Sequence, residues 1–205
     1  MERFLITHSL LSSWQYMYDC WSGSEDDAAE EFVNTLKRTP KEQTPAMLNG
    51  IAFENEIYNA ARGVVREPHE KWEHGIQKIV PIVKGAPFQV RLSRPLEIDG
   101  WSLLCYGILD ALKAGTIYDV KFSSKSMGSV EAAGKYLDSS QHPMYFYLCP
   151  EAREFQYLLS DGEDLYIERY QREESRDVSE IIRQFLQSIE SMGLADLYRA
   201  HWKSK

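Results

Sequence analysis

The chain has 205 residues, enough for one domain with a substantial core, and we expect a single domain over 1–205. No apolar run approaches the roughly 18 to 20 residues of a membrane span, and the amino terminus lacks a signal-peptide pattern, so a cytoplasmic protein without membrane contact is expected. The formal net charge of −8 argues against nucleic-acid binding through bulk charge alone, although it leaves a local basic groove open.

The expected elements run from helices through strands and back to helices, which indicates an α/β or α+β fold. Apolar residues recur at helical intervals early and late in the chain and alternate in its middle. Asp99-Gly100 is a turn signal within 88–122, which predicts a three-stranded meander there. We expect helices over 8–20, 26–36 and 46–65, a short segment that is helical as far as 78, strands over 88–98, 101–111 and 116–122, a polar loop over 123–128, a helix over 130–147 interrupted near 139–140, hairpin strands over 154–159 and 165–170, and helices over 178–192 and 194–202.

The cysteines and histidines give no metal-binding pattern. Cys20, Cys105 and Cys149 are an odd number at wide spacings, which favours buried free thiols over a disulfide framework or a zinc site. His69 and His74 are five residues apart, the wrong interval for one helical face.

Charged residues interrupt the apolar stretch from Tyr106 to Ser126. Asp119 and Lys121 are two apart on a predicted strand and therefore share a face, and a turn over 113–115 can bring Asp110 beside them. Charges among apolar, β-branched neighbours are unfavourable unless they are paired or bind a metal. The alternative is that Asp-x-Lys marks the solvated face of an edge strand.

Other polar residues lie on the predicted elements around this stretch. Glu54 occupies a helix face beside the apolar stripe and is positioned to point inward; the alternative is an exposed helix carboxylate. Gln141 and Tyr145 are one helical turn apart and project together; the alternative is a capped helix with a half-buried tyrosine. Ser123 and Lys125 follow the Asp-x-Lys strand and could hold a phosphate, or form an ordinary polar turn.

Four short patterns occur in one order along the chain. They are Gly50-x-x-x-Glu54 on a helix, Gly107-x-x-Asp110 on a strand, Asp119-Val120-Lys121 on the next strand and Gln141-x-x-x-Tyr145 on a following helix. In this order and spacing the chain resembles the PD-(D/E)XK nuclease superfamily, in its RecB-like and phage lambda exonuclease-like branch, over about 9–147. The resemblance implies a restriction-endonuclease-like core with a central mixed β-sheet of about five strands flanked by helices.

The resemblance also implies a catalytic site that uses Mg²⁺, with Mn²⁺ able to substitute. Asp110 and Asp119 would be direct ligands, the Val120 carbonyl a third, and Glu54 would complete the set directly or through a water. Hard oxygen donors of this kind suit Mg²⁺, which supplies charge for phosphodiester hydrolysis. Lys121 would orient the attacking water or stabilise charge on phosphorus.

By the same resemblance, Gln141 and Tyr145 contact the substrate strand or brace the metal site. Ser123 and Lys125 are candidate substrate contacts because of their place after the Asp-x-Lys strand. This chain departs from the family pattern because no proline precedes Asp110. Some relatives carry an iron–sulfur cluster on four cysteines, and with three cysteines none is expected here.

The resemblance favours a phage or mobile-element exonuclease that acts on linear DNA ends, duplex or single-stranded, in recombination or repair. Its location would be the cytoplasm of a bacterial or phage-infected cell, with a single-strand annealing protein as a partner and homo-oligomers as an option. Two alternatives stay open: an endonuclease of the same fold, and a nucleic-acid or protein-binding module whose nuclease site is no longer used. The acidic net charge is the strongest point for the second alternative.

Overall fold

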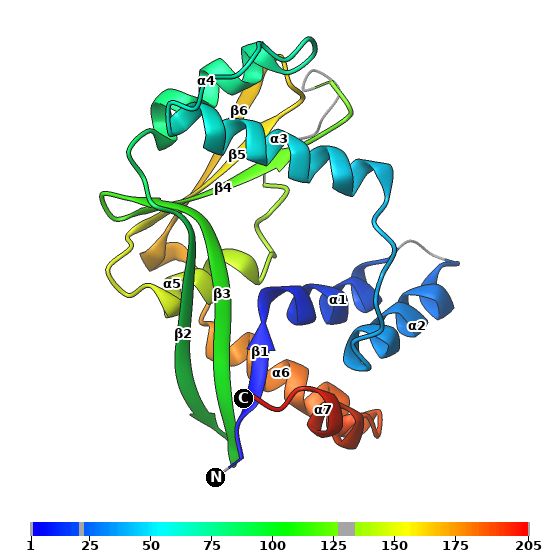
Figure 1. Cartoon of the computed structure of the whole chain (residues 1–205). Helices are drawn as coiled ribbons and strands as arrows, with labels where there is room; N and C mark the ends of the chain where they lie inside the picture. The colour runs from blue at the N-terminus through cyan, green and yellow to red at the C-terminus, as the bar shows by residue number, and fades with distance from the viewer. Residues whose placement is uncertain (1, 21–22, 127–133, 205) are drawn as a thin grey trace.

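A mixed β-sheet forms the centre of the computed structural model, which describes residues 2–20, 23–126 and 134–204 (Figure 1). Within those ranges the sheet has six strands, in the order β1-β3-β4-β5-β6, with β2 paired to β3. The β1–β3 and β4–β5 pairs are parallel and the others antiparallel. The strands are β1 Phe4–Thr7, β2 Phe88–Ile98, β3 Trp101–Lys113, β4 Thr116–Phe122, β5 Glu154–Ser160 and β6 Leu165–Gln171.

Helices cover the sheet in two groups (Figure 1). The helices α3 and α4 lie together over the β4–β6 part, and α1, α2, α6 and α7 gather near β1. The bounds are α1 His8–Asp19, α2 Glu25–Leu36, α3 Pro45–Ala61, α4 Glu73–Val83, α5 Gln141–Leu148, α6 Val178–Ser191 and α7 Ala195–His201, with a short 3₁₀ helix, η2, at Arg172–Glu174.

Apolar packing fixes α3 against the sheet. Phe53 and Ile57, one turn apart on α3, are fully buried in a core shared with α4 and with Val120 of β4. The start of α3 is set by Thr44, whose hydroxyl accepts a hydrogen bond from Met47 N at 3.2 Å. Glu54, the next residue after Phe53, therefore lies beside the part of α3 that packs on the sheet.

The predicted α/β class with a central mixed sheet is confirmed, as are the 88–122 meander and the carboxyl-terminal hairpin. Asp99 and Gly100 form the first turn with φ of 48° and 81°. The second turn, at Ala114 and Gly115, has φ of 51° and 82°, left-handed values that suit a two-residue hairpin loop.

Several boundaries differ from the sequence expectation. The strand β1 was not predicted, and the helix expected over 46–65 ends at Ala61. The segment expected to be helical only to 78 forms α4, which continues through Pro81 to Val83. In place of a helix over 130–147, residues 134–140 form turns and bends before α5; residues 127–133, which include part of that helix and the end of the expected 123–128 loop, lie outside the described residues.

Two smaller observations concern the cysteines and the membrane. Cys105 and Cys149 are buried free thiols, whereas Cys20 is partly exposed because it follows the end of α1, which corrects its expected burial. In the ranges that the structure describes, no helix is both long enough and apolar enough to cross a membrane.

Candidate active site

An uncovered stretch of one edge of β3 creates the candidate site. The strand β2 fills one edge of β3 from Trp101 to Ala111, so β1 and β4 must both pair with the other edge. There β1 covers 103–106 and β4 covers 111–113. The edge at 107–110 therefore has no neighbouring strand among the described residues, and its backbone groups need other partners.

Asp110 lies where β3 and β4 separate. The last paired positions are Ala111 and Tyr118, and the same register places Asp110 opposite Asp119. Asp110 Oδ2 accepts a hydrogen bond from Val120 N at 2.9 Å, so a carboxylate takes the place of a backbone partner. Because the N–H and C=O of one strand residue point to the same side, the Val120 carbonyl also faces this gap.

Asp119 is held by two neighbours inside the gap. Asp119 is only 2% exposed, and its Oδ1 accepts a hydrogen bond from the Gln141 side-chain amide at the start of α5. Its Oδ2 lies 2.6 Å from Lys121 Nζ as an ion pair, without a hydrogen bond of good geometry. The pair confirms that alternate residues of β4 share one face and places an ammonium beside the carboxylates.

Glu54 enters from α3 with two supporting residues. Its Oε1 accepts hydrogen bonds from the Tyr58 hydroxyl, one helical turn away, and from Gln89 Nε2 on β2 at 2.9 Å. The i to i+4 spacing from Glu54 to Tyr58 is a signal that sequence reasoning could have used. No comparable signal marks Gln89, because a polar residue on an alternating strand is expected to face solvent.

The site brings three carboxyl groups, those of Glu54, Asp110 and Asp119, close to one ammonium, that of Lys121. Burial, and then the charges of Asp119 and Glu54, raise the pKa of Asp110 well above its usual range. Burial also raises the pKa of Glu54, and Asp119 adds to that shift. Burial alone would lower the pKa of Lys121, but the charges of Asp119 and Asp110 raise it above its ordinary value. The carboxylates therefore interact strongly with one another and with Lys121.

The oxygen atoms available in the site are of the chemical type that a hard divalent cation binds. Carboxylate oxygens and a strand carbonyl are the ligands that Mg²⁺ and Mn²⁺ prefer, and a cation would relieve the repulsion that raises these pKa values. As the side chains stand, no three His, Cys, Asp or Glu residues within the described ranges are grouped closely enough to hold a metal ion. Binding would thus require the carboxylates of Glu54, Asp110 and Asp119 to turn toward one point.

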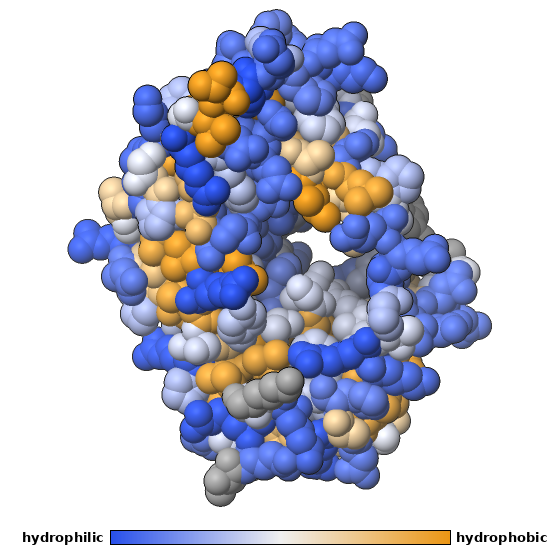
Figure 2. Space-filling model, viewed as in Figure 1, coloured by the Kyte–Doolittle hydropathy of each residue, from blue (hydrophilic) through white to orange (hydrophobic). Residues whose placement is uncertain are grey.

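A cavity of about 320 Å³ gives access to Lys121 and Gln141. In the space-filling view the molecule is hollowed between the positions of α3 and α1 (Figure 2). The imidazole of His8, the first residue of α1, bonds to Ser140 Oγ at 3.1 Å; burial, then Lys121 and His142, lower its pKa to about 3, so it is neutral. The other lining residues are Ser12, Gln15, Tyr16, Asp19, Lys135, Tyr136, Asp138 and Ser139.

The remaining expected site residues lie around this group. The Tyr145 hydroxyl donates to the Ile108 carbonyl at 3.0 Å, on the uncovered edge of β3, and Tyr145 is only 7% exposed. This contact, like that of Gln141 with Asp119, favours bracing over direct substrate contact. Ser123 Oγ and the Lys125 backbone bond to each other in a local turn.

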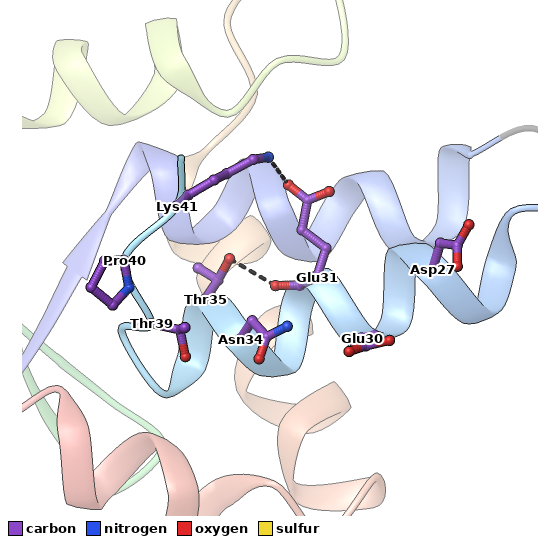
Figure 3. Close-up of a pocket in the computed structure, with 8 residues that line it drawn as sticks. All are labelled: Asp27, Glu30, Glu31, Asn34, Thr35, Thr39, Pro40 and Lys41. Carbon is purple, nitrogen blue, oxygen red and sulfur yellow. Dashed lines mark hydrogen bonds and ion pairs between the residues drawn. The ribbon is translucent and has the colours of Figure 1, made fainter. Parts of the chain in front are cut away.

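A second cavity, of about 290 Å³, lies on α2 and the segment after it (Figure 3). Asp27, Glu30 and Glu31 line it, and Lys41 forms an ion pair with Glu31. The excess of carboxylates would repel a phosphate, so this cavity does not suit a polyanionic substrate.

Comparison with known proteins gives structural matches only. No protein-family model matches the sequence, and no curated protein matches it. The crystal structure of SSO0001 superimposes with a TM-score of 0.55 at 14% sequence identity, covering 93% of this chain and 78% of that one. The crystal structure of LHK-Exo in complex with dAMP gives a TM-score of 0.45 at 15% identity, covering 91% and 90%. The first similarity shows a shared fold.

Proposed function

We propose that this protein is a divalent-metal-dependent nuclease that hydrolyses phosphodiester bonds at the gap between β3 and β4. One observation carries the proposal: Glu54, Asp110, Asp119 and Lys121 come from three separate elements, Lys121 pairs with Asp119, and burial together with the neighbouring carboxylates raises the pKa of both Asp110 and Glu54. Sequence patterns that resemble PD-(D/E)XK nucleases support the same assignment.

The chemistry of the site follows from its residues. Asp110, Asp119, Glu54 and the Val120 carbonyl would hold the cation, which supplies the charge that neutralises a phosphate and acidifies a bound water. Lys121 keeps its proton and would stabilise negative charge on the phosphorus oxygens. Gln141 restrains the Asp119 carboxylate through its hydrogen bond to Oδ1.

More specifically, we propose a DNA exonuclease that acts on linear ends, in phage or mobile-element recombination or repair, with Mg²⁺ as the natural cation. This finer assignment rests on the sequence resemblance, as do the expected annealing-protein partner, the homo-oligomer and the cytoplasmic location. We also assign Ser123 and Lys125 as candidate phosphate contacts, because the Lys125 side chain is exposed beyond the end of β4.

The test is degradation of end-labelled linear DNA by the wild type and by Asp119→Ala, with Mg²⁺ or with EDTA. The wild type should release label only with Mg²⁺, and Asp119→Ala should be inactive while its circular dichroism is unchanged. Asp196→Ala, at an exposed aspartate of α7, is the matched control and should retain activity. Activity of Asp119→Ala at the wild-type level would refute the role of Asp119, and cleavage of closed circular DNA would identify an endonuclease.

A further inference from the structure

Gln89 adopts a backbone conformation that its side chain disfavours. Its φ is 56°, the left-handed region that glutamine rarely enters because its Cβ crowds the backbone. It lies within β2 between the Phe88–Ala111 and Val90–Leu109 pairs, so the register places it opposite Asp110. Left-handed non-glycine residues persist only where surrounding interactions hold them, and they concentrate at functional sites.

The side chain of Gln89 belongs to a closed set of hydrogen bonds. Gln89 Nε2 donates to Glu54 Oε1 at 2.9 Å and to the Tyr58 hydroxyl oxygen at 3.0 Å. The Tyr58 hydroxyl in turn donates its one hydrogen to Glu54 Oε1. Both amide hydrogens and the hydroxyl hydrogen therefore have acceptors, which fixes the amide orientation because a carboxylate only accepts.

The left-handed backbone explains how two neighbouring residues reach the same tyrosine. In a regular strand, adjacent side chains point to opposite faces. Here the Phe88 ring lies 4.7 Å from the Tyr58 ring, centroid to centroid, while the adjacent Gln89 bonds to the Tyr58 hydroxyl. A regular conformation at Gln89 would turn its amide away from Glu54.

We propose that Gln89 is a positioning residue that holds Glu54 by its Oε1 beside the gap, from where Glu54 can turn to a cation together with Asp110 and Asp119, and that its left-handed backbone is maintained for this purpose. The inference rests on the proposed function, since it assigns Glu54 to the cation site. Removal of a side chain that orients a metal ligand typically lowers metal affinity or activity by about 10- to 100-fold.

The test compares Gln89→Gly with the wild type by urea unfolding in EDTA, by Mn²⁺ titration calorimetry, and by kcat and KM on linear DNA. Glycine relaxes the backbone and removes the amide, so the unfolding midpoint should stay the same or rise. Mn²⁺ affinity and kcat should both fall by about 10-fold or more, with KM for DNA changing less. A residue that only supports the fold would not separate stability from metal affinity in this way.

Two further variants control the comparison. Ala114→Gly relaxes a left-handed residue in the β3–β4 turn, with φ of 51°, and should leave Mn²⁺ affinity and kcat unchanged. Gln89→Asn tolerates the same backbone but is one methylene too short to keep both bonds, so it should lose Mn²⁺ affinity as Gln89→Gly does.

The outcomes separate this inference from the proposed function. If the wild type binds Mn²⁺ and degrades DNA, and both Gln89 variants match it in affinity and kcat, the positioning role is wrong while the nuclease assignment stands. If the wild type neither binds Mn²⁺ nor degrades DNA, the proposed function is wrong, and this inference falls with it.

Discussion

Replacing Asp110 by asparagine should stabilise the metal-free protein and abolish its activity. The Asn carbonyl can still accept the hydrogen bond from Val120 N, so the local geometry is retained while one negative charge is lost. Two like charges about 6 Å apart, at an effective dielectric constant of about 20, repel by about 3 kcal/mol. Asp110 faces two carboxylates and one ammonium, so we expect a net gain of roughly 1 to 3 kcal/mol, or roughly 3 to 9 °C in Tm.

The stability that Asp110→Asn gains over the wild type should increase with pH. Because the pKa of Asp110 is raised in the folded state, the folded protein binds this proton more tightly than the unfolded chain. The stability that this tighter proton binding gives the folded wild type is fully present below the ordinary aspartate pKa of about 4. It is lost as the pH rises through the raised pKa of Asp110. Asp110→Asn avoids the loss, so its advantage over the wild type should be small near about pH 5 and larger near about pH 8.

Thermal and urea unfolding in EDTA at the two pH values measure this difference, with Asp196→Asn as a control at an exposed carboxylate. Degradation of labelled DNA with Mg²⁺ should fall at least about 100-fold in Asp110→Asn, because a ligand is lost. A variant that is less stable than the wild type at the higher pH would refute the reasoning, since burial and the neighbouring carboxylates would then not disfavour the charge on Asp110.

Three other predictions address the site and the core next to it. Lys121→Ala should lose about 10²- to 10³-fold in turnover but keep Mn²⁺ binding; calorimetry that finds binding lost would overturn the assigned role. Mn²⁺ affinity should weaken as the pH falls, with protons released on binding, because the pKa values of Glu54 and Asp110 are raised; equal affinity from about pH 5.5 to 8 would contradict this. Gly162→Ala should destabilise the fold by about 1 to 3 kcal/mol in urea unfolding, since φ is 96° and a Cβ would lie 2.7 Å from Trp72 Cδ1; a change below about 0.5 kcal/mol would show that Trp72 moves freely.

Local signals were enough to predict much of the sheet. The β2–β3–β4 meander follows from alternating apolar residues and from turn residues such as Asp99 and Gly100, whose left-handed φ values the hairpin uses. The pairing of Asp119 with Lys121 follows in the same way from the two-residue repeat of a strand, and the hairpin register places Asp110 opposite Asp119.

Nonlocal contacts account for what the sequence did not reveal. The four residues of β1 carry no distinctive pattern, and their strand conformation depends on parallel pairing with 103–106 of β3, far along the chain. That pairing also defines the uncovered edge of β3, so the shape of the site could not be predicted without it. Gln89 was missed for a related reason: its role depends on a left-handed backbone that no sequence rule assigns to glutamine in a strand.

The central claim is that the gap between β3 and β4 holds a divalent cation. Anomalous diffraction from crystals soaked in Mn²⁺ tests it most directly. We predict a peak about 2.0 to 2.3 Å from oxygens of Asp110 and Asp119 and from the Val120 carbonyl, which disappears in Asp119→Ala. A wild-type protein that degrades DNA with Mn²⁺ but shows no peak in this gap, or a peak elsewhere, would contradict the account.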